Sequence, residues 1–535
     1  MKNKILILSF LGFQLFAIAQ EDAWVFFTDK ENVTQSLLNP TTILTQKSID
    51  RKASQGISID ERDVPVNENY ILQLKQANGI TVLAKSKWFN AVHVRGTQID
   101  INALGTFAFV QSIQFAGSSA SSSKINHIPV NKFDLENNLR INFNYGDTQN
   151  QIQMIGVDYL HEQDFTGEGI TVAILDSGFP GVNNIDAFFR LRDNNKLLDG
   201  YDFVDRNNDV YAYTGNTHGT RVLSTMAAYI ENQYVGSAPD AYYYLFRTED
   251  VGSETPVEES YWVEAAERAD SLGVDVINTS LGYKDYDNTN YNHLSSDLDG
   301  YTTYITRGAN IAFEKGLLLV NSAGNSGTSG VNAPADSPFV VSVGSVDSSG
   351  NYSTFSSQGS PIQPTQKPNV VARGSSAYIV SETNTVLQNS GTSFSSPILA
   401  GGLVCLKQAY PNLSNQELIN TMQQSASQFA TPDYFLGYGI PNFESALNVL
   451  KQKNNFSVSD IDIFPNPVQD ELNIKRVSMS ESIELVIYNV LGKEVLNMEL
   501  NKPLTSINTS TWSTGLYMVI IKSNSDSRLI KVIKD

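Results

Sequence analysis

Three short motifs, far apart in the chain, carry side chains that could share one proton-transfer reaction. Asp176 follows an apolar run and precedes Ser177 and Gly178, His218 lies in the segment THGT, and Ser393 lies in the segment GTSFSSP. A hydroxyl becomes a nucleophile when a nearby imidazole takes its proton, and a carboxylate can hold that imidazole in place. The three motifs therefore predict a catalytic serine, its base and an orienting acid.

Each of these residues also has a structural interpretation. An Asp after a strand and a Ser beside a Gly are usually turn or helix-capping residues, and a single His is more often structural than catalytic. The three motifs together favour the catalytic interpretation over the structural one. A five-position match to G-T-S-x-S-x-P is expected by chance in only about one chain in a thousand at ordinary residue frequencies. The presence of all three motifs favours catalysis.

The surrounding sequence predicts the elements that would position these motifs. Apolar runs typical of buried strands alternate with helical stretches, at residues 170–175, 274–277, 317–320 and 339–343. Residues 261–272 have helical periodicity and precede Gly273, a typical helix-ending residue. The alternation predicts an α/β fold, with a mainly parallel sheet, helices on both faces, and chemistry beyond the carboxyl ends of the strands.

Over roughly residues 150–455 the chain resembles the subtilisin-like serine proteases, the subtilases, in which the three motifs follow the order Asp, His, Ser. The resemblance implies that Asp176 fixes the tautomer of His218, and that His218 takes the proton of Ser393 as the serine oxygen attacks a peptide carbonyl. Water would then hydrolyse a covalent acyl-enzyme, and no cofactor would be needed for catalysis.

Two further segments match the family. Ala323-Gly324-Asn325 follows a predicted strand, and the resemblance implies that the Asn325 amide and the backbone N–H of Ser393 stabilise the oxyanion that forms on attack. Taken alone, this Asn is a typical turn residue. The segment Ser280-Leu281-Gly282 resembles the strand that pairs with an extended peptide, so Ser280, Leu281, Gly282, Ala323 and Gly324 are the predicted substrate-binding residues. An ordinary strand end is the alternative for residues 280–282.

The sequence departs from the family in places. Ser177 stands where the family more often has Thr, and Arg221 stands where a second His often follows the catalytic one. Residues 283–307 form a polar and aromatic stretch where many subtilases are shorter, so specificity cannot be carried over. Carboxylates of the kind that Ca²⁺ prefers lie in this stretch, and a structural calcium site there competes with a solvated acidic loop; the candidate ligands are Asp285, Asp287, Asp297 and Asp299.

The N-terminal region predicts export and latency. Residues 1–19 read as a signal peptide, with Lys2 and Lys4 before an apolar run that is shorter than the roughly 20 residues of a membrane-spanning helix. Residues 20–120 have the position and size of the inhibitory propeptide that subtilases commonly carry, which makes the protein a zymogen. A linker over residues 121–150 and a peptidase domain over residues 151–455 follow.

Residues 456–535 lose the helical signal and show short alternating strands, which predicts a small all-β sandwich. The block resembles the C-terminal sorting domain of the type IX secretion system in the segments FPNP at 464–467, IYNVLGK at 487–493 and GLY at 515–517. The resemblance implies export through the type IX secretion machinery and later removal of the tail. A generic β-sandwich for adhesion or stability is the alternative.

Composition narrows the range of partners. A formal charge of -19 repels phosphate backbones and anionic membranes, which excludes nucleic acid as an expected partner. The single cysteine, Cys405, permits no internal disulfide and lies among apolar residues typical of a buried helix. No segment after the signal resembles a transmembrane helix, so we expect no membrane span in the mature form, and we expect a monomer.

Together these patterns predict a secreted or cell-surface serine endopeptidase that cuts broad protein and peptide substrates. One alternative is a catalytically silent cell-surface protein that keeps the fold for binding or adhesion. The retention of Asp176, His218, Ser393 and Asn325 argues against it. A processing protease of narrow specificity is the other alternative, and the sequence does not separate it from the broad enzyme.

Overall fold

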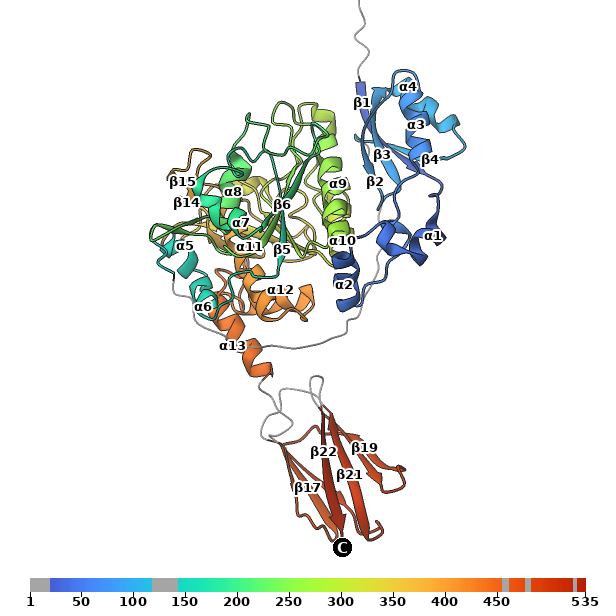
Figure 1. The fold of residues 1–535 in the computed structure, drawn as a ribbon, viewed down its shortest axis with the longest axis vertical. Coiled ribbons are helices and arrows are strands. Elements are labelled where there is room, and N and C mark those ends of the chain that lie inside the picture. Colours follow the sequence, from blue (N-terminus) through green and yellow to red (C-terminus); the bar gives the residue numbers. More distant parts are fainter. Residues whose placement is uncertain (1–19, 118–142, 455–460, 477–482, 523–526) are drawn as a thin grey trace, which may run out of the picture. The chain divides into compact units, whose positions relative to one another are not determined.

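The computed structural model describes residues 20–117, 143–454, 461–476, 483–522 and 527–535. The chain divides into two compact units, residues 1–444 and 445–535 (Figure 1). The predicted signal peptide and residues 121–142 of the predicted linker lie outside the described residues. Residues 143–150, the rest of that linker, lie against the peptidase fold, because Gly146 forms a β-bridge with Tyr234 and the Asp147 N–H donates to the Gln233 carbonyl at 2.8 Å.

A seven-stranded sheet organises the larger unit, in the order β13-β12-β11-β10-β5-β9-β6, and every neighbouring pair is parallel. This confirms the predicted α/β class. The strands are β5 (Thr171–Asp176), β6 (Leu197–Asp202), β9 (Tyr242–Arg247), β10 (Val276–Thr279), β11 (Leu318–Ser322), β12 (Val340–Val346) and β13 (Val370–Arg373). Strands β5, β10, β11 and β12 each begin one or two residues after the first residue of the corresponding apolar run, and they end beyond the last residue of that run. They continue past the apolar side chains because the hydrogen bonds of a strand are made by its backbone.

Helices cover both faces of this sheet (Figure 1). Helices α8 (His218–Ala227) and α11 (Thr392–Ala409) pack together, and α11 lies along β10 to β13. Helices α9 (Val257–Leu272) and α10 (Tyr304–Glu314) pack together against β5 and β11. Helix α9 ends at Gly273, whose φ of 79° permits the left-handed turn predicted there.

The remaining elements of residues 143–454 are smaller. They are α5 (Gln149–Gln153), α6 (Val157–Glu162), η4 (Asp186–Phe188), α7 (Phe189–Asp193), β7 (Tyr229–Ile230), β8 (Tyr234–Val235), η5 (Thr289–Tyr291), η6 (Gly327–Ser329), β14 (Ala377–Val380), β15 (Val386–Asn389), α12 (Asn415–Gln424) and α13 (Phe443–Asn454). Within α11, Cys405 is buried as predicted, and burial raises the pKa of its thiol well above the usual range.

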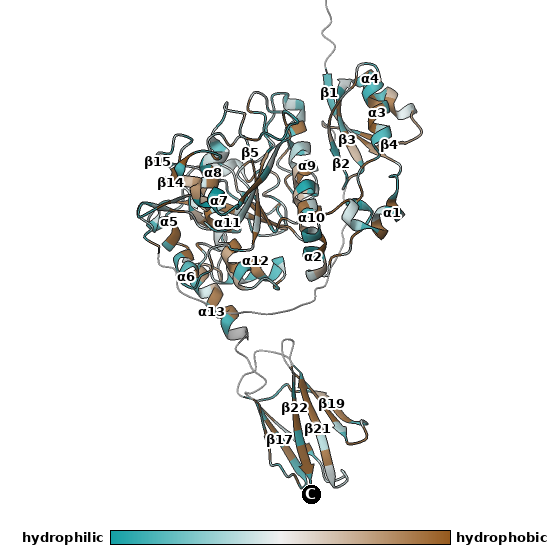
Figure 2. Cartoon of the chain, in the orientation of Figure 1, coloured by the Kyte–Doolittle hydropathy of each residue, from teal (hydrophilic) through white to brown (hydrophobic). Residues whose placement is uncertain are grey.

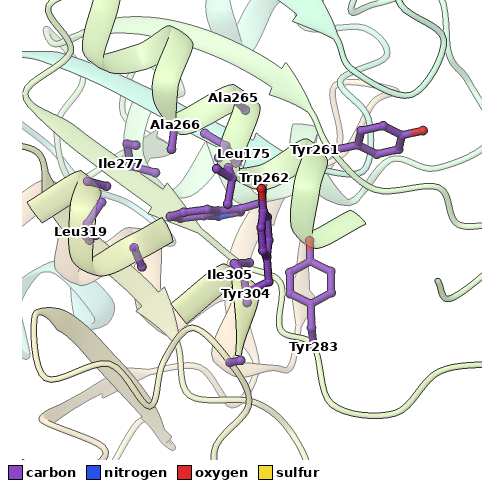
Figure 3. Close-up of a cluster of buried hydrophobic side chains, with 14 of the residues drawn as sticks. Leu175, Tyr261, Trp262, Ala265, Ala266, Ile277, Tyr283, Tyr304, Ile305 and Leu319 are labelled. Carbon is purple, nitrogen blue, oxygen red and sulfur yellow. The ribbon is translucent and has the colours of Figure 1, made fainter. Parts of the chain in front are cut away.

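Trp262 lies at the centre of the core between α9, α10 and the sheet. Figure 3 shows its ring in the middle of the cluster, near Leu175, Ile277 and Ile305. The indole N–H donates to the Thr279 hydroxyl at 2.9 Å, so its polar group is paired inside the core. This packing fixes α9 against β5 and β10, the two strands whose ends lead to Asp176 and to residues 280–282.

Residues 20–117 fold around an antiparallel sheet of order β2-β3-β1-β4. Its elements are β1 (Gln20–Phe27), α1 (Val33–Leu38), η1 (Pro40–Thr42), α2 (Gln46–Ser54), η2 (Glu61–Asp63), α3 (Glu68–Gln76), β2 (Thr81–Ser86), β3 (Ala91–Thr97), α4 (Gln98–Ala103), η3 (Leu104–Thr106) and β4 (Val110–Phe115). The sheet encloses an apolar core of its own and packs against α9 and α10. Trp24 stacks on Tyr304 with ring centroids 4.5 Å apart.

The second unit carries two antiparallel sheets, β16-β17-β20 and β19-β18-β21-β22, around one apolar core, as predicted for a small β-sandwich. The strands are β16 (Ile461–Phe464), β17 (Glu471–Arg476), β18 (Glu484–Asn489), β19 (Glu494–Glu499), β20 (Leu504–Asn508), β21 (Gly515–Lys522) and β22 (Ser527–Lys534). Figure 2 shows hydrophobic residues along these strands. Among the helices that the structure describes, none has the length and apolar character to span a bilayer.

Replacing the central tryptophan of the larger core tests this account. The test uses a chain that carries Ser393→Ala, so that it cannot cut itself. In this chain Trp262→Ala should lower the free energy of unfolding by about 3 to 5 kcal/mol, because loss of the indole creates a cavity and removes the donor to the Thr279 hydroxyl. Urea unfolding followed by far-UV circular dichroism measures the change. Phe189→Ala, at a side chain that is 41% exposed, is the control and should shift the midpoint little. Equal shifts for the two variants would contradict the assigned core.

Candidate active site

Asp176 and His218 meet at the carboxyl edge of the sheet. Asp176 is the last residue of β5 and is 0% exposed, and its Oδ1 lies 2.7 Å from Nδ1 of His218, the first residue of α8. The same oxygen accepts from the Ser177 backbone N–H at 2.7 Å and from its hydroxyl at 3.1 Å. Three donors on one oxygen fix the carboxylate in front of the imidazole.

A glycine allows this close approach. A Cβ on Gly219 would lie 2.6 Å from the Gly178 carbonyl oxygen and 3.0 Å from the Asp176 Cβ, so a larger residue after His218 would push α8 away from β5. The segments THGT and DSG therefore pack closely against each other because a glycine lies at the contact.

The electrostatics of His218 suit a general base. Burial lowers its pKa, but the charge of Asp176 and the hydrogen bond to it raise it, and the net effect is a pKa above the ordinary value of 6.5. Arg221, one turn along α8 and paired with Glu382 at 3.3 Å, acts in the opposite direction and lowers the His218 pKa. Since the carboxylate accepts at Nδ1, that nitrogen carries the proton and Nε2 is left as the basic atom.

Ser393 lies at the same edge, as the second residue of α11. Its side chain is largely buried, and the ring of the next residue, Phe394, has its centroid 5.9 Å from that of His218. The Ser393 hydroxyl donates to the Ser280 carbonyl at 3.2 Å, and the Ser280 hydroxyl donates to the Ser393 carbonyl at 2.8 Å. For a proton to pass from Ser393 to His218, the serine hydroxyl must turn from the Ser280 carbonyl to Nε2. Catalytic hydrogen bonds of this kind often form fully only when substrate is bound.

Asn325 is exposed beside the start of α11. Its Oδ1 accepts from the Thr392 backbone N–H at 2.9 Å and from the Thr392 hydroxyl at 3.0 Å. Its Nδ2 lies 3.6 Å from the position that a Cβ of Gly391 would take. With the oxygen held by Thr392, the amide N–H₂ is left to donate to a group beside Ser393. The sequence did not point to Thr392 as the residue that orients this amide.

Residues 280–282 continue β10 beside Ser393. The Asn321 side chain donates to the Leu281 carbonyl at 3.0 Å, and a Cβ on Gly282 would lie 2.8 Å from the Asn332 Cβ. Ser280 is buried, Leu281 is half-buried and Gly282 is exposed. On the other side, Ala323 is buried and Gly324, with φ of 108°, is half-buried against Ser357. The five predicted substrate-binding residues thus belong to two segments that lead toward the start of α11.

The four aspartates predicted as calcium candidates each accept a hydrogen bond from another residue. Asp285 accepts from Asn292, Asp287 from the Glu254 N–H, Asp297 from the Leu294 N–H, and Asp299 from the Tyr301 and Thr302 N–H groups. Among the residues that the structure describes, no three of them lie close enough to share an ion. The calcium site stays a prediction.

A different acidic cluster lies near Asp176, and sequence reasoning missed it. Oxygens of Glu249, Glu254 and Glu258 lie within 4.8 Å of one another. Burial, followed by repulsion from neighbouring carboxylates, raises the pKa of Glu249 and of Glu258. Glu249 accepts from the Tyr283 hydroxyl at 2.9 Å, and Asp176 contributes to its raised pKa. The spacing of these glutamates in the sequence gave no signal of the cluster.

A parallel sheet that carries a buried Asp–His pair beside a helix-borne serine defines the class of serine hydrolases. The Subtilase family model matches residues 167–439, a Bacteroidota peptidase S8 propeptide model matches residues 22–130, and a secretion system C-terminal sorting domain model matches residues 462–535. The chain belongs to the subtilase family and is a serine-type endopeptidase with a propeptide domain. Its sorting domain indicates export to the cell surface or the medium.

Curated relatives and a solved structure agree with this assignment. The chain is 31% identical to Subtilisin DY of Bacillus licheniformis over 302 residues, which cover 55% of this chain and 97% of the relative. It is 29% identical to Subtilisin E of Bacillus subtilis (strain 168) over 305 residues, covering 55% and 70%. The epidermin leader peptide processing serine protease of Staphylococcus aureus has the same fold, with a TM-score of 0.53 at 17% identity, covering 81% of this chain and 100% of that one.

The raised pKa of His218 and its modulation by Arg221 predict a pH profile. A general base accepts a proton only when it is neutral, so with His218 in this role kcat/KM should rise with pH through an apparent pKa above 6.5. Arg221→Gln removes a charge that lowers this pKa, so the acidic limb should move to higher pH. Rates on a peptide substrate between about pH 5 and 9 measure the shift.

Arg206→Gln is the matched control, because Arg206 is also an arginine paired with a glutamate, Glu264, at 2.8 Å. Its profile should overlay that of the parent enzyme. A shift of the Arg221→Gln limb to lower pH, or no shift, would contradict the assigned electrostatics.

Proposed function

We propose that this chain is a secreted endopeptidase that hydrolyses peptide bonds through an acyl-enzyme, with Ser393 as nucleophile, His218 as general base and Asp176 as the residue that orients it. The observation that carries the proposal is the 2.7 Å hydrogen bond from His218 to the buried Asp176, at the edge of the sheet where Ser393 opens α11. Polar groups from three distant segments have no structural need to converge there.

The proposed reaction has two halves. The Ser393 Oγ attacks the substrate carbonyl carbon while its proton passes to Nε2 of His218, and Asp176 stabilises the imidazolium that forms. That proton then goes to the departing amine as the peptide C–N bond breaks. Water attacks the remaining ester, His218 takes a proton from it and returns a proton to Ser393, which releases the acid product. The chemistry needs no cofactor, and a structural calcium ion stays a separate proposal.

Asn325 is the proposed donor to the oxyanion, together with the Ser393 backbone N–H. The hydrogen bonds from Thr392 to the Asn325 Oδ1 support this role, because they leave Nδ2 as the free donor beside the serine. A donor that is fixed before the reaction stabilises the developing charge without having to reorganise.

Ser280, Leu281 and Gly282 are proposed to pair with an extended substrate, opposite Ala323 and Gly324. Main-chain pairing gives affinity without requiring a particular sequence, which favours broad protein substrates. A narrow processing role is the second candidate, and the longer stretch 283–307, whose Tyr283 is held by Glu249 at 2.9 Å, is the feature that favours it. A catalytically silent binding protein would have no use for the Asp176–His218 pair.

The flanking assignments are proposals of the same kind. We propose a signal peptide at residues 1–19, an intramolecular inhibitor at 20–120, a linker at 121–150, a peptidase domain at 151–455 and a sorting domain at 456–535 that the type IX secretion machinery recognises. The inhibitor role is supported by Glu267 of α9, which accepts from the Ser86 hydroxyl at 2.5 Å and from the Lys87 and Trp88 N–H groups at 2.9 Å. The mature enzyme is proposed to act as a monomer.

Labelling with a fluorophosphonate probe tests the nucleophile. The mature enzyme should be labelled and should degrade casein, whereas Ser393→Ala should do neither, because the substitution removes the proposed nucleophile. Ser395→Ala is the matched control, since this serine lies in the same helix and donates to the Thr392 carbonyl at 3.0 Å. Equal labelling of the parent and the Ser393→Ala protein would refute the proposal.

Kinetics of Asn325→Leu test the oxyanion donor. The substitution should lower kcat by about 10² to 10³ with little change in KM, because the amide acts on the transition state rather than on the bound substrate. Steady-state rates on a chromogenic peptide measure both constants. Asn194→Leu is the control, because Asn194 is also an exposed asparagine. A change confined to KM would mean that Asn325 only binds substrate.

A further inference from the structure

The propeptide contacts the enzyme at two separate places. The first is the side of α9 and α10, where the propeptide sheet packs through Trp24 and where Glu267 accepts from residues 86–88. The second is the pair of C-terminal ends of the same helices. Residues 44–63, here called the clamp segment, leave the propeptide sheet between β1 and α3 and cover those ends with α2 and η2.

The clamp segment satisfies carbonyl groups at the helix ends. The Ser48 hydroxyl donates to the Asp270 carbonyl at 2.7 Å, and the Thr45 N–H donates to the Ser271 carbonyl at 2.9 Å. Arg51 donates to the Lys315 carbonyl, just past the end of α10, at 3.1 Å. The last carbonyls of a helix have no partner within it and carry partial negative charge, so cations and hydroxyl groups stabilise them.

Glycines at the two helix ends allow close contact with the clamp segment. Gly273 and Gly316 follow α9 and α10 with positive φ, of 79° and 92°. A Cβ on Gly273 would lie 2.7 Å from the Ser48 nitrogen, and a Cβ on Gly316 would lie 2.6 Å from the Ile57 Cδ1. The glycines therefore permit both the helix ends and the close approach of the clamp segment.

A buried network of charges joins the two sides. Arg51 and Lys52 of the clamp segment pair with Asp270 of α9, and Lys315 pairs with Asp60 and Asp63 of the clamp segment at 2.9 and 2.8 Å. Lys52 also lies 3.4 Å from Asp63. The side chains of Lys52, Asp63, Asp270 and Lys315 are at most 1% exposed.

The network holds three positive and three negative groups, and four of its ion pairs join the enzyme to the clamp segment, so separation leaves Asp270 and Lys315 without these partners. The enzyme contributes one member of each sign, Asp270 and Lys315, and the clamp segment contributes the other four. Removing one member of a buried ion pair leaves an uncompensated charge, which is strongly unfavourable. Breaking any one of these contacts should therefore loosen the whole interface.

We propose that the C-terminal ends of α9 and α10 form a second docking surface, remote from the substrate-binding segments, whose partner is the clamp segment, and that this surface sets how long the propeptide stays on the enzyme. The inference rests on the proposed inhibitory role of residues 20–120. The docking surface is the place where that inhibitor is held. The residues that hold the propeptide there are different from the residues that are proposed to carry out catalysis.

Dissociation of the propeptide tests the surface. The full chain carries Ser393→Ala, so that it cannot cut itself, and a recognition sequence for a site-specific protease is inserted after residue 120. After cleavage the protein is diluted to nanomolar concentration, and size-exclusion chromatography at timed intervals measures the fraction of propeptide still bound. Lys52→Met and Lys315→Met should each increase the dissociation rate at least tenfold, because each removes a cation from the buried network and weakens the pairing of Asp270 or Asp63 across the interface.

Lys75→Met is the matched control, since Lys75 is an exposed lysine of α3, and it should release the propeptide within about twofold of the parent rate. Near-UV circular dichroism of the uncut chain checks that each variant is folded. Should Lys52→Met or Lys315→Met fail to fold, Arg62→Ala decides the question, because Arg62 is one-third exposed and joins Glu314 at 2.8 Å at the margin of the surface. It should release the propeptide about threefold faster. Folded variants that release the propeptide at the control rate would overturn the inference.

A parallel arm separates this inference from the proposed catalytic function. In chains that keep Ser393, the lag before casein hydrolysis should shorten in the same order as the dissociation rates rise. Faster release without any casein hydrolysis would refute the proposed function and leave the docking surface standing. Casein hydrolysis with unchanged release would support the proposed function and refute the docking surface.

Discussion

The hydrogen bond between the buried Asp176 carboxylate and His218 is the interaction on which the rest of the site depends. The Asp176 side chain has no exposed surface, and its Oδ1 accepts from the Ser177 N–H, the Ser177 hydroxyl and the His218 Nδ1–H, which are the partners that a buried polar group needs. The bond can form only where β5 ends and α8 begins. The central place of β5, between β9 and β10, therefore has a chemical consequence, since movement of the strand would misdirect the base.

Helix α9 connects this site to the core and to the propeptide. Its inner side places Trp262 among residues of β5 and β10, and its outer side presents Ser260 and Glu267 to the propeptide. Its C-terminal end, with Asp270 and Gly273, receives the clamp segment. One helix thus supports the strand that carries Asp176 and binds the segment that is proposed to keep the enzyme latent. Changes in α9 are expected to affect folding and inhibition together.

Buried carboxyl groups have different neighbours at the clamp segment and in the cluster of Glu249, Glu254 and Glu258. At the clamp segment each carboxylate faces a lysine or arginine, and Lys52 and Lys315 lower the pKa of Asp63 against the effect of burial. Near the active site, burial followed by repulsion from neighbouring carboxylates raises the pKa of Glu249 and of Glu258. A buried carboxyl group therefore has a lowered pKa in one region and a raised pKa in the other, according to its neighbours.

The sequence by itself determined the order of the three motifs, the α/β class, the end of α9 at Gly273 and the strands of the sorting domain, because local periodicity and turn residues encode these features within a few positions. The calcium candidates, chosen because they were acidic and close in sequence, form no triplet among the described residues, while Glu249, Glu254 and Glu258 do. Only the tertiary structure decided that Thr392 orients Asn325 and that Arg51 reaches Asp270, 219 residues away. Such pairs depend on how helices and strands pack, and packing brings together residues whose separation along the chain carries no pattern.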